Sequence, residues 1–292
     1  MSDSNSSYYL PDPSHWPITG SIGLFLFFVG AATWLNGASI GGPLLLATGF
    51  GVVVFMLFGW FGTVIKESEG GLYNEDVDIS YRWSMSWFIF SEVMFFAVFF
   101  GSLLYFREFS VPWLSGNGAG YATNTFLWPE FVADWPMVVM PDPSNFDQYT
   151  DVIPAWDLPA INTMILLTSG LTITLAHWAL KAGNRTNLCW WLFITWALGF
   201  IFVYLQATEY IHAYHELNLK LSSGVYGSIF YMMTGFHGLH VTLGATMLLV
   251  VWGRSMKGHF SEDNHFAFEA VAWYWHFVDV VWLFLFVFVY WL

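Results

Sequence analysis

The amino-acid sequence predicts an all-helical integral membrane protein that crosses the bilayer seven times. Only 10% of its 292 residues are charged, whereas a soluble domain carries roughly 25%. Aromatic residues make up 21% and include 18 Trp, a type enriched where a membrane meets water. Seven apolar stretches are long enough, or nearly so, to cross ~30 Å of hydrocarbon as helices of about 20 residues.

The stretches are expected to form one membrane domain over 1–292, preceded by a soluble tail at 1–16. Helices are expected because membrane strands need only about 10 residues of alternating polarity. Pro17, Pro43 and Pro159 open three stretches, and proline suits a first helical turn, where its missing N–H has no partner anyway. The short joint at 37–42 predicts an antiparallel hairpin. The predicted spans are 17–36, 43–64, 84–107, 159–181, 188–210, 226–252 and 268–291.

The basic residues predict the orientation, because cytoplasmic loops of membrane proteins are rich in Lys and Arg. With the N-terminus on the cytoplasmic side, or the matrix side of a mitochondrion, only Arg107 and Lys220 lie outside. The C-terminus is then periplasmic. The residues expected on the inner side are Lys66, Arg82, Lys181, Arg185, Arg254 and Lys257.

A long outer connection at 108–158 separates the third and fourth spans. It is too rich in acidic residues and proline to cross the bilayer. One interpretation is that its acidity attracts a basic partner. The other, which we favour, is a solvated loop packed over the helix ends.

Composition excludes several classes of function. The net charge of −13 offers nucleic acid no attractive surface. The single cysteine, Cys189, excludes an internal disulfide, a Cys-rich zinc or iron–sulfur site and a C-x-x-C-H haem attachment. The tail at 1–16 has no Lys or Arg, unlike the start of a cleavable signal peptide.

Glu92 is the first candidate functional residue, because an ionisable group inside a membrane is costly to keep. It lies in the segment SEVMFFAVFF of the third span. Among so many aromatic rings we expect it to be buried and protonated. Two roles remain open: a proton-linked or lipid-contacting acid, and a structural carboxyl hydrogen-bonded to a neighbouring helix.

Two histidine patterns in later spans predict polar contacts between helices. His276 and Asp279 are three residues apart, so they share a helix face and are expected to form a structural pair. His237 and His240 have the same spacing, beside glycines that let another helix approach. We favour polar contacts over metal ligation for the second pattern. Haem ligation is a minor alternative for the helical histidines His177, His237, His240 and His276.

No metal site is predicted. The chain has two E-x-x-H matches, Glu209 with His212 and Glu262 with His265, and a di-iron bundle needs two such motifs in one core. The expected topology puts them on opposite sides of the membrane, so we do not expect a shared site. The sequence also has no phosphate loop, zinc-protease motif or dinucleotide fingerprint.

Several motifs resemble those of the cytochrome c oxidase subunit III family, in the family's order from residue 16 to the C-terminus. The longest blocks are VYGSIFYMMTGFHGLHV at 225–241 and FEAVAWYWHFVDVVWLFLF at 268–286. Shorter ones are WPITG at 16–20, SEVMFF at 91–96, NTMILLTSG at 162–170 and LQATEY at 205–210. The extra N-terminal hairpin favours the cytochrome c branch over the related quinol oxidases.

The resemblance implies seven helices in two groups, the first two and the last five, with phospholipid in a V-shaped cleft between them. It implies a chain without haem or copper, in a complex whose redox centres lie in subunits I and II. The chain is expected to pack on subunit I and to support proton uptake and turnover stability. Cytochrome c is the substrate of such a complex, and a larger respiratory supercomplex is a further candidate assembly. Glu92 matches the family's buried glutamate, and positions around the lipid cleft are matched by Trp60, Glu67, Arg82, His240 and Arg254.

Two departures from the family pattern affect these expectations. Lys66 stands where many members have arginine, which weakens the case for a two-pronged phosphate contact there. The 108–158 connection is longer than in mitochondrial members, which favours a bacterial inner membrane over a mitochondrial one. A subunit of a quinol oxidase and an independent transporter remain alternatives, although the chain has no internal repeat of the kind many transporters show.

Overall fold

The computed structural model describes residues 8–292 and confirms the predicted fold class. Within this range the chain is helical, has no strand, and contains seven helices long and apolar enough to cross a membrane. Of the tail expected at 1–16, residues 1–7 lie outside the described residues, and 8–15 precede the first helix. Several helices are longer than their apolar stretches, because a helix need not end where the hydrocarbon does.

The chain divides into two compact units, residues 1–81 and 82–292. The boundary falls inside the third long helix, α3 (Glu75–Tyr105). The resemblance places the corresponding division earlier, between the second and third spans.

The first unit contains the hairpin of α1 (Trp16–Leu35) and α2 (Gly41–Glu69). The two helices touch through glycines. A Cβ atom on Gly30 would lie 2.2 Å from the backbone nitrogen of Leu46, and one on Gly49 would lie 2.2 Å from that of Phe27. Both distances are far below contact distance, so the hairpin depends on small residues at these points.

A short turn after α2 leads into α3. The hydroxyl of Tyr73 donates to Glu67 Oε2 at 2.8 Å, and its ring packs edge-on against Tyr81. Burial, together with hydrogen bonds to Tyr81 and Glu67, raises the pKa of Tyr73. These contacts tie the end of α2 to the first turns of α3.

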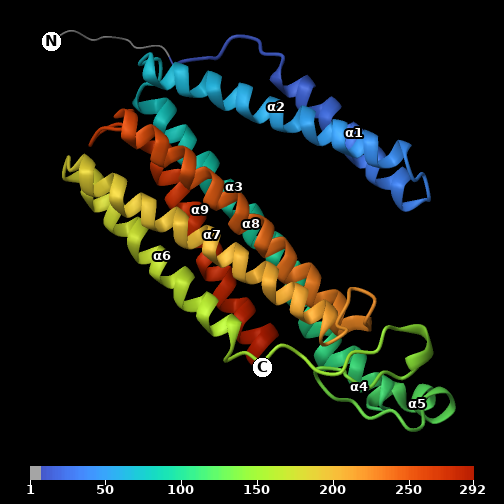
Figure 1. Cartoon of the computed structure of the whole chain (residues 1–292). Helices are drawn as coiled ribbons and strands as arrows, with labels where there is room; N and C mark the ends of the chain where they lie inside the picture. Colours follow the sequence, from blue (N-terminus) through green and yellow to red (C-terminus); the bar gives the residue numbers. More distant parts are fainter. Residues whose placement is uncertain (1–7) are drawn as a thin grey trace. The chain divides into compact units, whose positions relative to one another are not determined.

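Four helices of the second unit form a closed bundle. Each packs against the next, and α9 packs back against α6, as Figure 1 shows for these four helices. A π-helical segment, Phe286–Trp291, continues α9 to the C-terminus. The four helices are α6 (Leu158–Lys181), α7 (Arg185–His215), α8 (Gly224–Lys257) and α9 (Phe266–Leu285).

Two fully buried tryptophans of α9 form the centre of the bundle. The indole N–H of Trp275 donates to Ser169 Oγ, and that of Trp282 donates to Thr163 Oγ1, each at 2.9 Å. Both acceptors lie on α6. The bundle therefore combines large aromatic packing with satisfied polar groups, as a buried indole requires.

The part of α3 in the second unit contacts the bundle through long side chains. Phe95 meets Phe236 of α8 edge-on, with ring centroids 5.1 Å apart. Phe88 stacks on Tyr274 of α9, with centroids 6.2 Å apart. Aromatic rings thus bridge α3 to two helices of the bundle.

The 108–158 connection is partly helical. After α3 a π-helical segment (Phe106–Ser110), α4 (Val111–Leu114) and α5 (Tyr121–Leu127) follow. The later residues pack on the turn between α7 and α8, where the backbone N–H of Thr150 donates to the carbonyl of Leu217 at 3.1 Å. Tyr149 stacks on Tyr226. This arrangement supports the interpretation of a loop packed over helix ends.

The basic residues of the second unit separate to its two ends. We call one the basic end; it contains the α6–α7 turn, the α8–α9 loop and the α3 turn at Arg82. The opposite end contains Lys220, which lies 4.0 Å from Asp147 of the long connection. The basic end is defined by Arg82, Lys181, Arg185, Arg254 and Lys257.

Candidate functional site

Glu92 of α3 and His240 of α8 form a polar pair between two membrane helices. Glu92 Oε2 lies 2.9 Å from His240 Nε2. The other ring nitrogen, Nδ1, donates to the carbonyl of Phe236 at 2.6 Å, which leaves Nε2 available to Glu92. Phe95 and Phe96 flank the imidazole, so the pair is shielded by aromatic rings on the α3 side.

Glu92 is only partly buried, with 21% of its side chain exposed. The sequence predicted a buried, protonated acid. Its partner comes from α8, 148 residues further along the chain. A carboxyl and an imidazole at this distance can share or exchange a proton.

His237 and His240 face different neighbours. His237 is fully buried, and its Nε2 donates to the carbonyl of Val278 on α9 at 3.2 Å. Its ring packs against Trp282 and Phe202, with centroids 5.1 and 5.7 Å away. The two histidines therefore link α8 to α9 and to α3 separately.

His276 and Asp279 lie on the same face of α9, as their spacing predicts. His276 Nδ1 is 3.7 Å from Asp279 Oδ2, and Nε2 lies 3.4 Å from Thr174 Oγ1 on α6. A Cβ atom on Gly170 of α6 would lie 2.4 Å from Asp279 Oδ2. The glycine thus makes room for the carboxylate between the two helices.

The residues expected at lipid positions lie in both units. Trp60 and Glu67 belong to α2 in the first unit. Arg82 pairs with Glu269 at the start of α9, and the guanidinium of Arg254 lies over the ring of Phe260, 4.6 Å from its centroid.

His240 does not fit the expectation that it lies near lipid head groups together with Arg254. The two are fourteen residues apart on α8, roughly 21 Å along the helix at ~1.5 Å per residue. His240 lies near the middle of this helix, so its contact with Glu92 is at the depth of the hydrocarbon.

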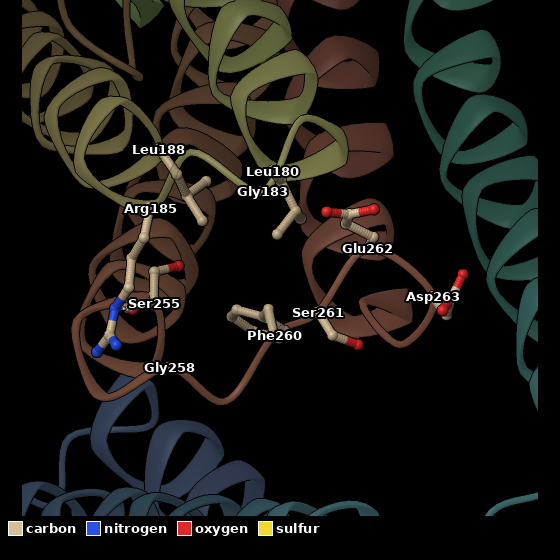
Figure 2. Close-up of a pocket in the computed structure, with 10 residues that line it drawn as sticks. All are labelled: Leu180, Gly183, Arg185, Leu188, Ser255, Gly258, Phe260, Ser261, Glu262 and Asp263. Atoms are coloured by element: carbon tan, nitrogen blue, oxygen red, sulfur yellow. Dashed lines mark hydrogen bonds between the residues drawn. The ribbon is translucent and has the colours of Figure 1, made fainter.

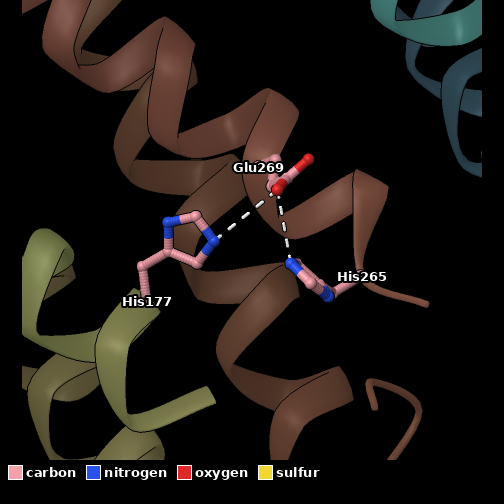
Figure 3. A group of neighbouring side chains, drawn as sticks. All are labelled: His177, His265 and Glu269. Carbon is pink, nitrogen blue, oxygen red and sulfur yellow. Dashed lines mark ion pairs between the residues drawn. The ribbon is translucent and has the colours of Figure 1, made fainter. Parts of the chain in front are cut away.

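Three side chains that sequence reasoning did not connect converge at the basic end. His177 comes from α6, while His265 and Glu269 come from the start of α9. Figure 3 shows both imidazoles directed at the Glu269 carboxylate. His265 and Glu269 are four residues apart, the spacing of one helix face, so the sequence could have indicated their contact. No pattern in the sequence indicates that His177 approaches them.

A pocket of about 320 Å³ lies beside this group, between the α6–α7 turn and the α8–α9 loop. Arg185, Glu262 and Asp263 are its charged lining residues, as Figure 2 shows. Arg185 already donates to the backbone carbonyls of Ser255 and Met256. With two carboxylates and an engaged guanidinium, the pocket does not favour an anionic head group.

A more apolar groove of about 530 Å³ runs between α7 and α8 from the same end. Trp190, Phe193 and Trp252 form its walls, and Arg185 lies at its edge. Such a groove suits an acyl chain whose head group lies near a cation.

The two E-x-x-H motifs are far apart. One is on α7 near its C-terminal end, and the other is in the α8–α9 loop beside the N-terminal end of α7. Glu262 lines the pocket next to Arg185, where α7 begins. Glu209 lies 24 residues after Arg185 on α7, roughly 36 Å away by helical rise. It accepts a hydrogen bond from the Tyr290 hydroxyl at 2.7 Å. The motifs cannot share a metal ion.

Comparison with known proteins shows that the chain is similar to one protein family along most of its length. The family model described as "Cytochrome c oxidase subunit III" matches residues 6–115 and 143–292. Proteins named "Cytochrome c oxidase subunit 3" from Hippopotamus amphibius and Felis catus are each 40% identical, and one from Equus caballus is 39% identical. Each alignment covers 100% of this chain and 99% of the relative. The unmatched residues 116–142 fall within the long connection.

Proposed function

Because the chain belongs to the cytochrome c oxidase subunit III family, we propose that it acts as a non-redox subunit of a proton-pumping oxidase. In this role it packs on subunit I, in a complex whose haem and copper lie in subunits I and II, binds phospholipid and supports proton uptake and turnover stability. Cytochrome c is then a substrate of the complex and has no site on this chain.

The observation that carries the non-redox role is the engagement of the membrane histidines by this chain's own residues. His240 has contacts at both ring nitrogens. His237 donates to a backbone carbonyl and is enclosed by aromatic rings. His276 faces Asp279 and Thr174. A haem needs an open space beside its ligating histidine, and the rings of His237 and His240 are already held by contacts between helices. His276 is more open, with 46% of its side chain exposed.

Support for proton uptake comes from the Glu92–His240 pair. It joins two titratable groups at 2.9 Å in the hydrocarbon region, where ionisable residues mark proton or ion pathways. One side of the pair is partly exposed, so a proton can reach it from a neighbouring subunit.

Support for lipid binding comes from the groove between α7 and α8 and from the cations at the basic end. Arg254 lies in the last turn of α8, at a depth where an arginine can reach a phosphate. In this proposal the basic end faces the cytoplasm, with a bacterial inner membrane favoured over a mitochondrial one.

The test is purification of the chain from its native membrane in mild detergent, with partners and visible spectrum recorded. The expected result is co-purification with subunits that contain haem and copper, while the isolated chain is colourless. A Soret band in the isolated chain contradicts the proposal, and so does isolation without any redox partner. Partners that oxidise quinol instead of cytochrome c would assign the chain to the quinol branch.

The lipid part is tested on the same complex by mass spectrometry of retained phospholipid. Arg254→Ala is expected to lower the phospholipid retained per complex, whereas Arg107→Ala, at the opposite end, serves as the control. Equal retention in both variants and the parent contradicts a head-group role for Arg254.

A further inference from the structure

The group formed by His177, His265 and Glu269 has the geometry of a metal-binding site. Its potential ligand atoms all lie within 4.8 Å of one another. Glu269 Oε1 is 3.3 Å from His265 Nε2 and 3.7 Å from His177 Nε2. Zinc–ligand bonds of ~2.0–2.1 Å at tetrahedral angles separate ligand atoms by roughly 3.3 Å, so small side-chain movements bring all three onto one ion.

His265, the residue that precedes α9, is held in the tautomer that a metal requires. His265 Nδ1 donates to the backbone carbonyl of Ser261 at 3.0 Å, so its Nε2 carries a lone pair directed at the group. A carbonyl that receives the second ring N–H is the usual outer partner of a metal-bound histidine. The loop before α9 thus orients the ligand before any ion binds.

The two ring nitrogens that face Glu269 have no hydrogen-bond partner among the described residues. Nε2 of His177 and Nε2 of His265 are both buried and have no hydrogen-bond partner in the described part of the chain. Buried polar atoms are normally satisfied, and two such atoms beside one carboxylate would both be satisfied by a single cation.

Glu269 is oriented from its other side. Its Oε2 pairs with Arg82 of α3, which leaves Oε1 facing the histidines. The guanidinium fixes the carboxylate and also lowers its affinity for a second cation, so we expect moderate rather than very tight binding. The three potential ligands come from α6 and from the start of α9. The guanidinium that orients Glu269 comes from α3, outside the closed bundle.

We propose that His177, His265 and Glu269 bind a divalent transition-metal ion at the basic end, with zinc as the best match. Two imidazole nitrogens and one carboxylate oxygen suit zinc, and a water molecule completes a fourth position. The bound ion joins the C-terminal part of α6 to the first turn of α9. The existence of this site does not depend on the proposed function.

The test uses the full chain in detergent, carrying Cys189→Ser so that the single thiol cannot compete. After treatment with a chelator, the chain is titrated with zinc chloride, and bound zinc per chain is measured by equilibrium dialysis and elemental analysis. One zinc per chain is expected. His177→Ala is expected to weaken binding at least about 100-fold, given that loss of even an outer partner costs about 10–100-fold.

His276→Gln is the matched control, since His276 lies on α9 outside the group, and it is expected to bind zinc like the parent. Equal zinc affinity in the parent and His177→Ala would overturn the proposal. If a variant fails to fold, X-ray absorption of the zinc-loaded parent tests the site without it. The spectrum should show two imidazoles and oxygen at about 2.0–2.1 Å, and a spectrum without imidazole scattering would contradict the site.

Discussion

The carboxylate of Glu92 and the imidazole of His240 meet between α3 and α8, with Oε2 and Nε2 separated by 2.9 Å. The contact joins a helix that lies outside the closed bundle to one that belongs to it. It is also the point at which two titratable groups meet within the hydrocarbon. The same pair therefore serves helix packing and is a candidate for proton exchange.

Glu92→Gln separates these two roles. Glutamine keeps the shape and can still bond to His240, so assembly and the visible spectrum of the complex are expected to stay unchanged. Proton uptake and pumping are expected to slow, because glutamine cannot exchange a proton. Pumping by the reconstituted complex is the measurement, and Glu130→Gln in the long connection is the control. If Glu92→Gln pumps like the parent across a wide pH range, the residue is structural.

A second prediction concerns Tyr290 and Glu209, both buried. Tyr290→Phe removes the 2.7 Å hydrogen bond to Glu209 and leaves a buried carboxyl oxygen unsatisfied, at an expected cost of about 1–3 kcal/mol in the free energy of unfolding. Combining it with Glu209→Met should recover most of that loss, since replacing both partners by apolar groups is nearly neutral. Denaturant titration in detergent, followed by Trp fluorescence, measures the cycle. Strictly additive losses would show that the two residues do not interact.

The α1–α2 hairpin provides a prediction about packing. Gly49→Ala places a Cβ atom 2.2 Å from the backbone of Phe27, so the helices must separate, at an expected cost of about 1–3 kcal/mol or more. Gly62→Ala on the same helix meets nothing within 4 Å and should gain about 0.5–1 kcal/mol from helix propensity. The free energies of unfolding of the two variants should therefore change in opposite directions. A similar change for both would argue against glycine-mediated contact.

Stability at alkaline pH should depend on Tyr149 in the long connection. Burial raises the pKa of Tyr149 above its ordinary value of 10.0, so the folded state holds this proton longer than the unfolded state. The contribution of the protonated hydroxyl is complete below pH 10 and is lost as the pH rises above that value. Tyr149→Phe should therefore make the free energy of unfolding less sensitive to pH above 10.

Near neutral pH the same variant should be close to the parent in stability, because the Tyr149 hydroxyl has no hydrogen-bond partner in the described chain. Tyr121→Phe, at an exposed position of the same connection, is the control and should leave the alkaline dependence unchanged. A Tyr149→Phe variant with the parent's full alkaline loss would contradict this account.

The predicted orientation is tested by thiol labelling in a Cys189→Ser background. A cysteine at Asn145 in the long connection should react with an impermeant reagent from the periplasmic side, and one at Asp263 in the α8–α9 loop should react from the cytoplasmic side. The physical reason is the placement of most basic residues at the basic end. Reaction of the Asn145→Cys variant from the cytoplasm would reverse the orientation.

The amino-acid sequence by itself determined the properties that depend on neighbouring residues. The number of membrane helices follows from seven apolar stretches, because hydrocarbon thickness sets a minimum length that can be counted along the chain. The His276–Asp279 contact follows from helical periodicity. The family follows from long motifs that keep their order.

Only the tertiary structure decided which distant groups meet. The partner of Glu92 comes from 148 residues away, and nothing in the sequence around Glu92 identifies it. His237 and His240 looked like one pair but bond to different helices, since residues three apart still point about 60° from each other at ~3.6 residues per turn. His177 reaches His265 and Glu269 because α6 and α9 pack side by side, and no local pattern specifies which helices become neighbours.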